Sequence, residues 1–359
     1  MKVEHSEEKY YDPDWQRPDV IYGNELLNQI VEPGEKVAVA TMEIPWNLVK
    51  DRFPVKPETV IFVQNMELDT LKNQEKSVPP VDVVAGLGGG SSHDLAKYLA
   101  LKKKARLVQV PTILSADASV TSAIGIREKG KVKYIAHVKA DRIVVDFSLI
   151  RQAPKELVRY GAGDILSSHT AIYDWKLASR KGKERFEERY YDEARQILNN
   201  LERRRFDIRD VTDEGIRTIV ELYLGYAEIA EKLGSDRAQE GSEHFFAYNV
   251  EHVTKKQYVH GKLLAIGIMI MSYLQNNEFE KTLGLTNSLG FETNLTTISL
   301  GKQEFSRILM TLKSFVEEGG YYYSTINETD FDTPTVEKLY EMLCEKGPPN
   351  RLLPSFHAR

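Results

Sequence analysis

The feature that most constrains the fold is a run of glycines between an apolar stretch and a helical pattern. Residues 81–97 read VDVVAGLGGGSSHDLAK, so a predicted strand runs into glycines 88–90 and Ser91 and emerges as a helix carrying Asp94 and Lys97. Because glycine has no Cβ, a phosphate can approach the main chain closely, and the helix that follows presents unpaired N–H groups and its positive dipole end. The segment predicts an anion site, with a nucleotide diphosphate as the ligand.

Two common phosphate motifs are absent from this segment, and a plain tight connection in an α/β domain is an alternative. The dinucleotide pattern G-x-G-x-x-G is not met because Ser91 stands three positions after Gly88, and no Gly-Lys-Ser/Thr ending marks a P-loop. The glycines also follow the third predicted strand, whereas a Rossmann unit places them after the first.

Short apolar runs alternate with helical patterns up to about residue 150. The predicted strands are residues 37–41, 59–64, 81–86, 107–110 and 142–147, and the predicted helices are 44–52, 68–75 and 92–101. This alternation predicts a parallel sheet covered by helices. Between the last two strands, residues 122–127 and 132–136 flank Glu128-Lys129-Gly130-Lys131, which predicts a β-hairpin inserted at the edge of the sheet.

After about residue 151 the pattern is helical, with no convincing strand. Predicted helices cover residues 184–205, 213–233, 259–273, 302–318 and 335–344. We therefore predict two domains, an α/β nucleotide-binding domain with a Rossmann-like parallel sheet over 1–152 and an all-α domain for metal and substrate over 153–359.

Composition excludes several classes of function. The chain has 359 residues, of which 42% are hydrophobic, and its net charge of −5 argues against a dedicated nucleic-acid surface. The longest apolar stretch, residues 263–274, is too short to cross a bilayer and predicts a buried helix, so no stable membrane insertion is expected. Cys344 is the only cysteine, which excludes an internal disulfide, and residues 1–11 lack a signal-peptide pattern, so we expect a cytoplasmic protein.

One carboxylate and two imidazoles stand out as candidate metal ligands. Asp164 lies in GAGD, His244 in GSEH and His260 in an HG pair at the start of the apolar helix, while His252 is a competing ligand. Taken singly, Asp164 is typical of a helix N-cap, and each histidine is typical of a hydrogen-bonded residue in the core. Together they form a three-ligand set that leaves a coordination position open, as in catalytic sites, but sequence spacing cannot show that they converge.

Four blocks of sequence resemble a known family. They are GGGSSHDLAK at 88–97, VPTILSADASVTSA at 110–123, GAGDILSSHTAIYDWKLA at 161–178, and GSEHFFAYNVEH with HGKLLAIG between 241 and 267. In order and spacing they are similar to the iron-containing alcohol dehydrogenase and dehydroquinate synthase superfamily, and within it to the glycerol dehydrogenase and glycerol-1-phosphate dehydrogenase branch. The resemblance implies a dehydroquinate synthase-like fold.

The resemblance also implies roles for individual residues. The cofactor diphosphate would contact Gly89, Gly90, Ser91 and Asp94. The nicotinamide and ribose would lie beside Thr112 and Ser115, with Thr121 or Ser122 as a further position. Asp117 would accept hydrogen bonds from substrate hydroxyls. A divalent metal, usually zinc in this branch, would be held by Asp164, His244 and His260, and His252 would then lie beside the site or on the helix surface.

The implied activity is a metal-dependent, NAD(P)-linked oxidoreductase in which Asp117, Asp164, His244 and His260 carry the chemistry. The metal lowers the pKa of the bound alcohol and the cofactor takes up the hydride, in a cleft between the domains. GSEH and the Asp-Trp pair favour interconversion of dihydroxyacetone phosphate and sn-glycerol 1-phosphate, and the SADA segment leaves glycerol dehydrogenase as an alternative. A sugar-phosphate cyclase like dehydroquinate synthase would need additional basic residues in the helical domain, and a nucleotide binder without turnover would not need all three ligands.

Two departures from the family pattern bear on the substrate, and one segment bears on the cofactor. Lys262 stands where an acidic residue is common, so it either pairs with a substrate phosphate or extends from the helix surface. Ala116 stands where the phosphate branch has histidine.

Thr41-Met42-Glu43 offers no basic group after its strand, which favours NAD over NADP. The family resemblance further implies a homo-oligomer.

Overall fold

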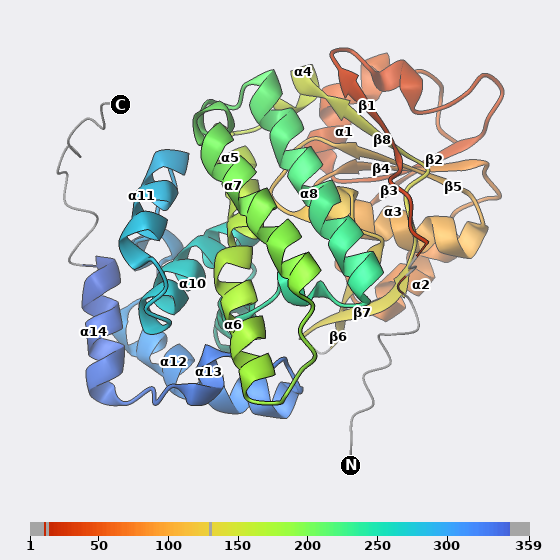
Figure 1. Ribbon diagram of the computed structural model, residues 1–359. Coiled ribbons are helices and arrows are strands. Elements are labelled where there is room, and N and C mark those ends of the chain that lie inside the picture. Colours follow the sequence, from red (N-terminus) through yellow and green to blue (C-terminus); the bar gives the residue numbers. More distant parts are fainter. Residues whose placement is uncertain (1–10, 12–13, 129–130, 345–359) are drawn as a thin grey trace, which may run out of the picture.

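The computed structural model describes residues 11, 14–128 and 131–344. The predicted hairpin turn at residues 129 and 130 and most of the N-terminal segment used for the localisation prediction lie outside these residues. The sheet occupies one side of the molecule and the later helices the other, as the change from red and yellow to green and blue makes visible (Figure 1). The described chain therefore has an α/β part followed by a largely helical part, as predicted.

All six strands of the main sheet described in the structure run parallel, in the order β1-β8-β5-β4-β2-β3. The strands are β1 (Asp19–Gly23), β2 (Val37–Thr41), β3 (Thr59–Phe62), β4 (Val83–Gly88), β5 (Arg106–Pro111) and β8 (Arg142–Asp146). The helices that connect or follow them are α1 (Glu43–Val49), α2 (Leu68–Lys76), α3 (Gly90–Lys103) and α4 (Phe147–Ile150). Parallel strands need such crossovers, so the predicted alternation of strand and helix is confirmed.

The central strands are buried on both faces. Every residue of β4 is buried, and successive side chains enter different cores: Val83 and Ala85 pack in one hydrophobic cluster, whereas Val84 packs in the other. A strand covered on both sides loses the polar alternation of a half-exposed strand. This is why the segment before the glycines reads as a continuous apolar run.

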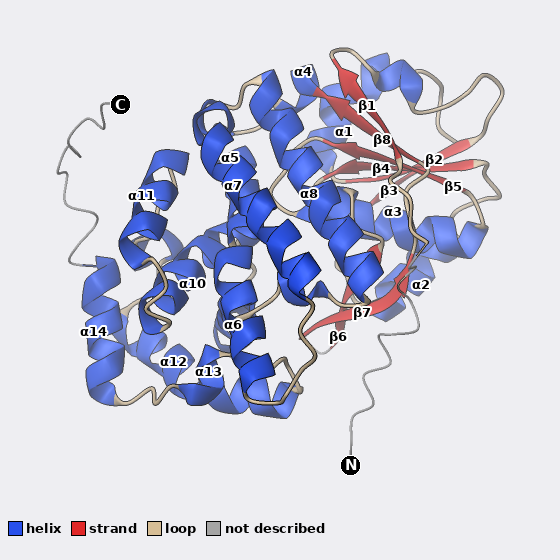
Figure 2. Cartoon of the chain, viewed as in Figure 1, coloured by secondary structure: helices blue, strands red, loops and turns tan. Residues whose placement is uncertain are grey.

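Two predictions about the sheet are wrong. Strand β1 was not predicted from the sequence, because its five residues are mostly half-exposed and show no clear alternation. When β1 is counted, the glycines follow the fourth strand and not the third. The hairpin, β6 (Ala123–Glu128) with β7 (Lys131–His137), forms a separate antiparallel sheet and does not extend the edge of the main one (Figure 2). Its backbone is tied to the loop before α2, where the Arg127 amide donates to the Met66 carbonyl at 2.8 Å.

Beyond β8, every regular element that the structure describes is a helix. Besides α4 and two short 3-10 helices, they are α5 (Lys155–Leu166), α6 (Ser168–Arg180), α7 (Glu188–Asp210), α8 (Asp213–Leu233), α9 (Ser242–Thr254), α10 (His260–Leu274), α11 (Phe279–Leu289), α12 (Lys302–Gly319), α13 (Thr325–Glu328) and α14 (Thr333–Cys344). The predicted bounds of α8 match, whereas α5, α6, α9 and α11 were not predicted individually. Among the described residues, no helix combines the length and apolarity that a bilayer span requires. The domain boundary between residues 152 and 153 stays a prediction.

Histidine 93, on α3 beneath the glycine turn, is expected to make stability depend on pH. Its Nδ1 lies 2.7 Å from Oε1 of Gln109 on β5, and no hydrogen-bond partner is found for its buried Nε2. Burial lowers the pKa of His93 to about 4, and the hydrogen bond to Gln109 only partly opposes this. Because the folded-state pKa lies below the unfolded value of about 6.5, this contribution to stability is complete above pH 6.5 and is lost as the pH falls toward 4.

We therefore predict that His93→Gln is less sensitive to acid than the wild type. Between pH 7 and pH 4.5 the wild type should lose about 2 kcal/mol more of its free energy of unfolding than the variant loses. Urea unfolding at the two pH values measures both losses. Equal losses in the two proteins would show that His93 does not titrate in this way.

Candidate active site

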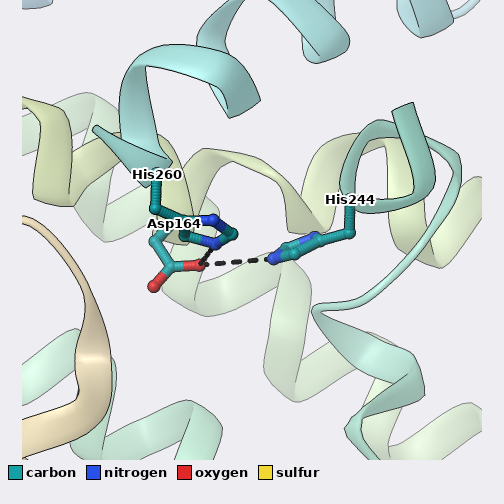
Figure 3. Close-up of side chains that lie close together, drawn as sticks. All are labelled: Asp164, His244 and His260. Carbon is teal, nitrogen blue, oxygen red and sulfur yellow. Dashed lines mark ion pairs between the residues drawn. The ribbon is translucent and has the colours of Figure 1, made fainter. Parts of the chain in front are cut away.

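Three predicted metal ligands come together from three different helices. Asp164 lies near the end of α5, His244 in the first turn of α9, and His260 is the first residue of α10. Oδ1 of Asp164 lies 3.5 Å from Nε2 of His244 and 3.7 Å from Nε2 of His260 (Figure 3). One ligand atom from each residue lies within 4.8 Å of the others. Because Asp164 is inside a helix, its interpretation as an N-cap is wrong.

Glycines allow these helices to approach closely. A Cβ built on Gly261 would lie 1.8 Å from the carbonyl oxygen of Tyr160, and one built on Gly163 would lie 2.6 Å from the carbonyl oxygen of Gly261. Since both contacts are with backbone atoms, a larger residue at either position would force the helices apart. The two glycines each adjoin a candidate ligand, Asp164 or His260, so the same close approach brings the ligands together.

The electrostatics of the cluster favour positive charge at its centre. Burial by itself would raise the pKa of Asp164, but His244 and His260 outweigh it and hold the pKa well below its usual range. Burial likewise opposes charge on His244, but Asp164 and Glu243 raise its pKa to about 10. A nearly buried carboxylate facing two imidazole nitrogens is also a donor set that zinc and other divalent ions accept in catalytic sites. The three residues thus fit a divalent metal.

His252, the competing ligand, lies outside the cluster. It is in the last turn of α9, whereas His244 is in the first, and its ring packs against Phe315 with ring centroids 5.3 Å apart. Among the described residues, the group able to hold a metal consists of Asp164, His244 and His260. His252 is therefore not a member of this cluster and does not line the cavity beside it.

Asp117 is held next to Asp164 by the main chain. Its amide donates to Oδ2 of Asp164 at 3.2 Å, and Nε2 of Gln239 lies 3.5 Å from its own Oδ2. Burial, followed by repulsion from Asp164, raises the pKa of Asp117 well above its usual value. The carboxyl group is thus in place to hydrogen-bond a hydroxyl of a molecule bound at the cluster.

The glycine turn has the backbone that phosphate binding requires. Gly88 has a φ of +147°, and a Cβ there would lie 2.5 Å from Oγ of Ser92, so the position needs glycine. Helix α3 begins directly after it, at Gly90, with the exposed Ser91 in its first turn. Asp94 is paired with Nζ of Lys97 at 2.9 Å, and the same ammonium donates to the Ala123 carbonyl of the hairpin at 2.6 Å. The helix end remains available to an anion while its first carboxylate is neutralised.

A cavity of about 410 Å³ joins the glycine turn to the three-residue cluster. Of the predicted site residues it is lined by Gly90, Ser91, Asp94, Ser115, Thr121, Asp117, Asp164, His244 and His260. Gly89 and Thr112 are not among the lining residues; Thr112 is buried behind the turn, its amide bonded to the Gly88 carbonyl. Ser122 turns away from the cavity to contact His137 and Glu231.

Several residues that line this cavity were not predicted from the sequence. Tyr248 follows His244 by one helical turn, a spacing that could have placed it on the same face of α9. Gln239 and Glu240 precede that helix, and Arg127 and Tyr134 come from the hairpin. No motif marks the hairpin residues, because only the packing of β6 beside α3 brings them to the cavity.

Lys262 does not line the cavity. Its Nζ lies 3.9 Å from Oε2 of Glu292 and 5.6 Å from the centre of the Tyr160 ring. The lysine therefore covers an aromatic ring with its charge near a surface carboxylate, as expected of a side chain that extends from the start of a helix.

The close contact at Gly261 can be tested by adding one methyl group. Gly261→Ala should lower the free energy of unfolding by about 3 kcal/mol or more, because its Cβ meets a backbone oxygen that cannot rotate away. Gly284→Ala on α11 is the matched control, since no atom lies within 4 Å of a Cβ there, and it should stay within about 1 kcal/mol of the wild type or gain stability. Urea unfolding measures both. Equal stability of the two variants would contradict the contact.

Comparisons with known proteins agree with this architecture. Residues 34–154 match the family model described as iron-containing alcohol dehydrogenase. A glycerol-1-phosphate dehydrogenase of Hyperthermus butylicus is 27% identical over 329 residues, which cover 88% of this chain and 91% of the relative. The enzyme of the same name from Pyrobaculum neutrophilum is 33% identical over 227 residues, or 60% of this chain and 64% of the relative.

A solved structure has the same fold. The crystal structure of a probable glycerol dehydrogenase from Sinorhizobium meliloti matches with a TM-score of 0.70 at 18% identity, covering 92% of this chain and 97% of the other. The resemblance drawn from the four sequence blocks is thereby confirmed. The chain is thus similar to the iron-containing alcohol dehydrogenases, through the family model over residues 34–154 and through a relative along 88% of its length.

Proposed function

We propose that this protein is a metal-dependent, NAD(P)-linked oxidoreductase that interconverts dihydroxyacetone phosphate and sn-glycerol 1-phosphate. The observation that carries the proposal is the single cavity that holds both the N-terminus of α3, after the glycine turn, and the cluster of Asp164, His244 and His260. Relatives that align over most of their length bear the name glycerol-1-phosphate dehydrogenase. Their substrate is the natural first choice for this chain.

Each group of residues has a distinct role in the proposed reaction. The N–H groups at Gly90 and Ser91 would hold the cofactor diphosphate, and the dipole of α3 would favour its negative charge. Ser115 and Thr121 line the same cavity, and the nicotinamide would lie beside them. Asp117 would orient a substrate hydroxyl. Asp164, His244 and His260 would hold the metal, which supplies Lewis acidity toward the reacting oxygen.

Zinc is the metal that we propose, with iron as the alternative within the superfamily. One carboxylate and two imidazoles suit both ions, and zinc has no redox chemistry that would compete with hydride transfer. Elemental analysis of the purified protein, followed by reconstitution of the apoprotein with each ion, decides between them.

The metal ligands can be tested against a histidine of the same helix. With NADH, zinc and dihydroxyacetone phosphate, Asp164→Asn and His260→Ala should lower kcat/KM at least about 100-fold, because the metal contributes several kcal/mol to transition-state stabilisation. His252→Ala, outside the cluster, should stay within about twofold of the wild type. Loss of absorbance at 340 nm follows the reaction. Full activity of either ligand variant would contradict the assignment.

Glycerol dehydrogenase is the second candidate, and the charge of the cavity favours it. The lining carboxylates are Asp94, Asp117, Asp236, Glu240 and Glu251, in addition to Asp164. Such a surface repels a phosphate ester and accepts an uncharged polyol. Parallel assays with dihydroxyacetone phosphate and dihydroxyacetone discriminate the two activities. Larger kcat/KM with the unphosphorylated ketone would favour glycerol dehydrogenase.

Arg127 is the residue that we propose to meet the substrate phosphate. It is the one arginine or lysine among the described lining residues, and its Nη1 is paired with Oε2 of Glu251 at 3.1 Å. Because the helical part contributes no lysine or arginine to the described lining, a sugar-phosphate cyclase, which needs several basic groups there, is not favoured. A guanidinium suits phosphate because its donors match two oxygens at once.

Arg127→Met should raise the KM for dihydroxyacetone phosphate roughly 10-fold or more and leave the KM for dihydroxyacetone unchanged, since a charge-assisted hydrogen bond contributes about 1.5–3 kcal/mol. Lys262→Ala, outside the cavity, should change neither value. Initial-rate kinetics with both ketones measure the effect. A rise confined to the KM for NADH would place Arg127 at the cofactor and not at the substrate.

NAD is the cofactor that we propose in preference to NADP. The segment after β2 continues with Met42 and Glu43, both exposed, and Glu43 opens α1. A carboxylate at this place pairs with ribose hydroxyls and repels a 2′-phosphate. The ratio of kcat/KM for the two cofactors tests the preference.

We also propose a homo-oligomer in a reducing cytoplasm. The proposal of an oligomer rests on the family resemblance. The proposal of a reducing compartment rests on Cys344, which has no second cysteine in the chain to pair with. Light scattering of the purified protein and fractionation of the cells test the two statements.

A further inference from the structure

The side chain of Glu243 is completely buried and lies against a candidate metal ligand. Its Oε1 is 2.8 Å from Nδ1 of His244 and accepts the amide of Gly241 at 2.8 Å. Its Oε2 accepts the hydroxyl of Thr170 on α6 at 2.5 Å. Three donors from two helices and a loop thus hold this carboxylate in one orientation.

This arrangement decides which nitrogen of His244 faces the cluster. A carboxylate only accepts hydrogen bonds, so Nδ1 of the imidazole must carry the proton that it donates to Glu243. When a metal binds, the ring must be neutral, and its lone pair is then on Nε2, the nitrogen that lies 3.5 Å from Oδ1 of Asp164 (Figure 3). The negative charge on Glu243 also makes that lone pair a stronger donor toward a cation.

We propose that Glu243 is a positioning residue that fixes the tautomer and the ring orientation of His244 for metal binding. The inference rests on the proposed metal site at Asp164, His244 and His260. Glu243 acts through His244 and does not line the cavity, so its effect should appear in metal affinity before it appears in the binding of substrate.

Stabilisation of the helix is the rival explanation, because a carboxylate in the first turn of α9 interacts favourably with the helix dipole. Asp174 on α6 provides a matched control. It is equally buried, and it accepts the amide of Ser242 at 2.9 Å and the amide of Thr325 at 2.7 Å. It therefore supports the same end of α9, without a hydrogen bond or ion pair to His244.

The test measures zinc affinity of the full-length apoprotein by competition with a chromophoric chelator, together with the thermal midpoint Tm. Glu243→Gln keeps the size and one acceptor oxygen but removes the charge, and it should weaken zinc binding 10- to 100-fold. Asp174→Asn should lower Tm at least as much and leave zinc affinity within about threefold of the wild type. If Glu243→Gln does not fold, Thr170→Val, which frees Oε2, should weaken zinc binding several-fold.

The outcomes separate this inference from the proposed function. If the wild type binds zinc and Glu243→Gln binds it equally well, the positioning role of Glu243 is overturned but the metal site is not. Equal loss of affinity in Glu243→Gln and Asp174→Asn would also overturn it, in favour of helix stabilisation. A wild type that binds no divalent ion would overturn the metal site itself and the role of Glu243 with it.

Discussion

Helix α10 begins against the backbone of α5, with Gly261 so close to the Tyr160 carbonyl that a Cβ would lie 1.8 Å from it. Gly163 lies on the other side of the same contact, and a Cβ built there would be 2.6 Å from the Gly261 carbonyl oxygen. Asp164 and His260 are the residues next to these glycines. The candidate metal centre depends on this contact, because any side chain between the helices would separate a carboxylate from the imidazole it faces.

The second constraint is that charge in the cavity is unevenly divided. The described lining contains six carboxylates and one arginine, and a positive charge is favoured at the point where Asp164 meets His244 and His260. A divalent ion there would balance part of the excess, and Arg127, paired with Glu251, balances another part.

The start of α9, which carries His244, is held by buried carboxylates. Glu243 binds Nδ1 of the ring, Thr170 holds Glu243 from α6, and Asp174 holds the amide of Ser242 at the same helix end. Buried carboxylates are costly unless their hydrogen bonds are satisfied, and here each oxygen has a donor. The second helix of the cluster is thus anchored from outside the cavity.

The parallel sheet, the glycine turn and the long amphipathic helices could be predicted from the sequence, because local period and glycine content report burial and backbone geometry directly. Strand β1 could not be predicted, since it is short and half-exposed. Helices α5 and α9 were not predicted either: Gly161 and Gly163 interrupt the helical pattern of α5, and α9 is a short helix that was considered only for its candidate ligands. Asp164, His244 and His260 were recognised as a chemically complete set by resemblance. Only the tertiary structure shows that these three residues converge, that His252 and Lys262 lie outside the cluster and the cavity, and that Arg127 lines the cavity. The physical reason is that each of these facts depends on how helices and a hairpin distant in sequence pack together.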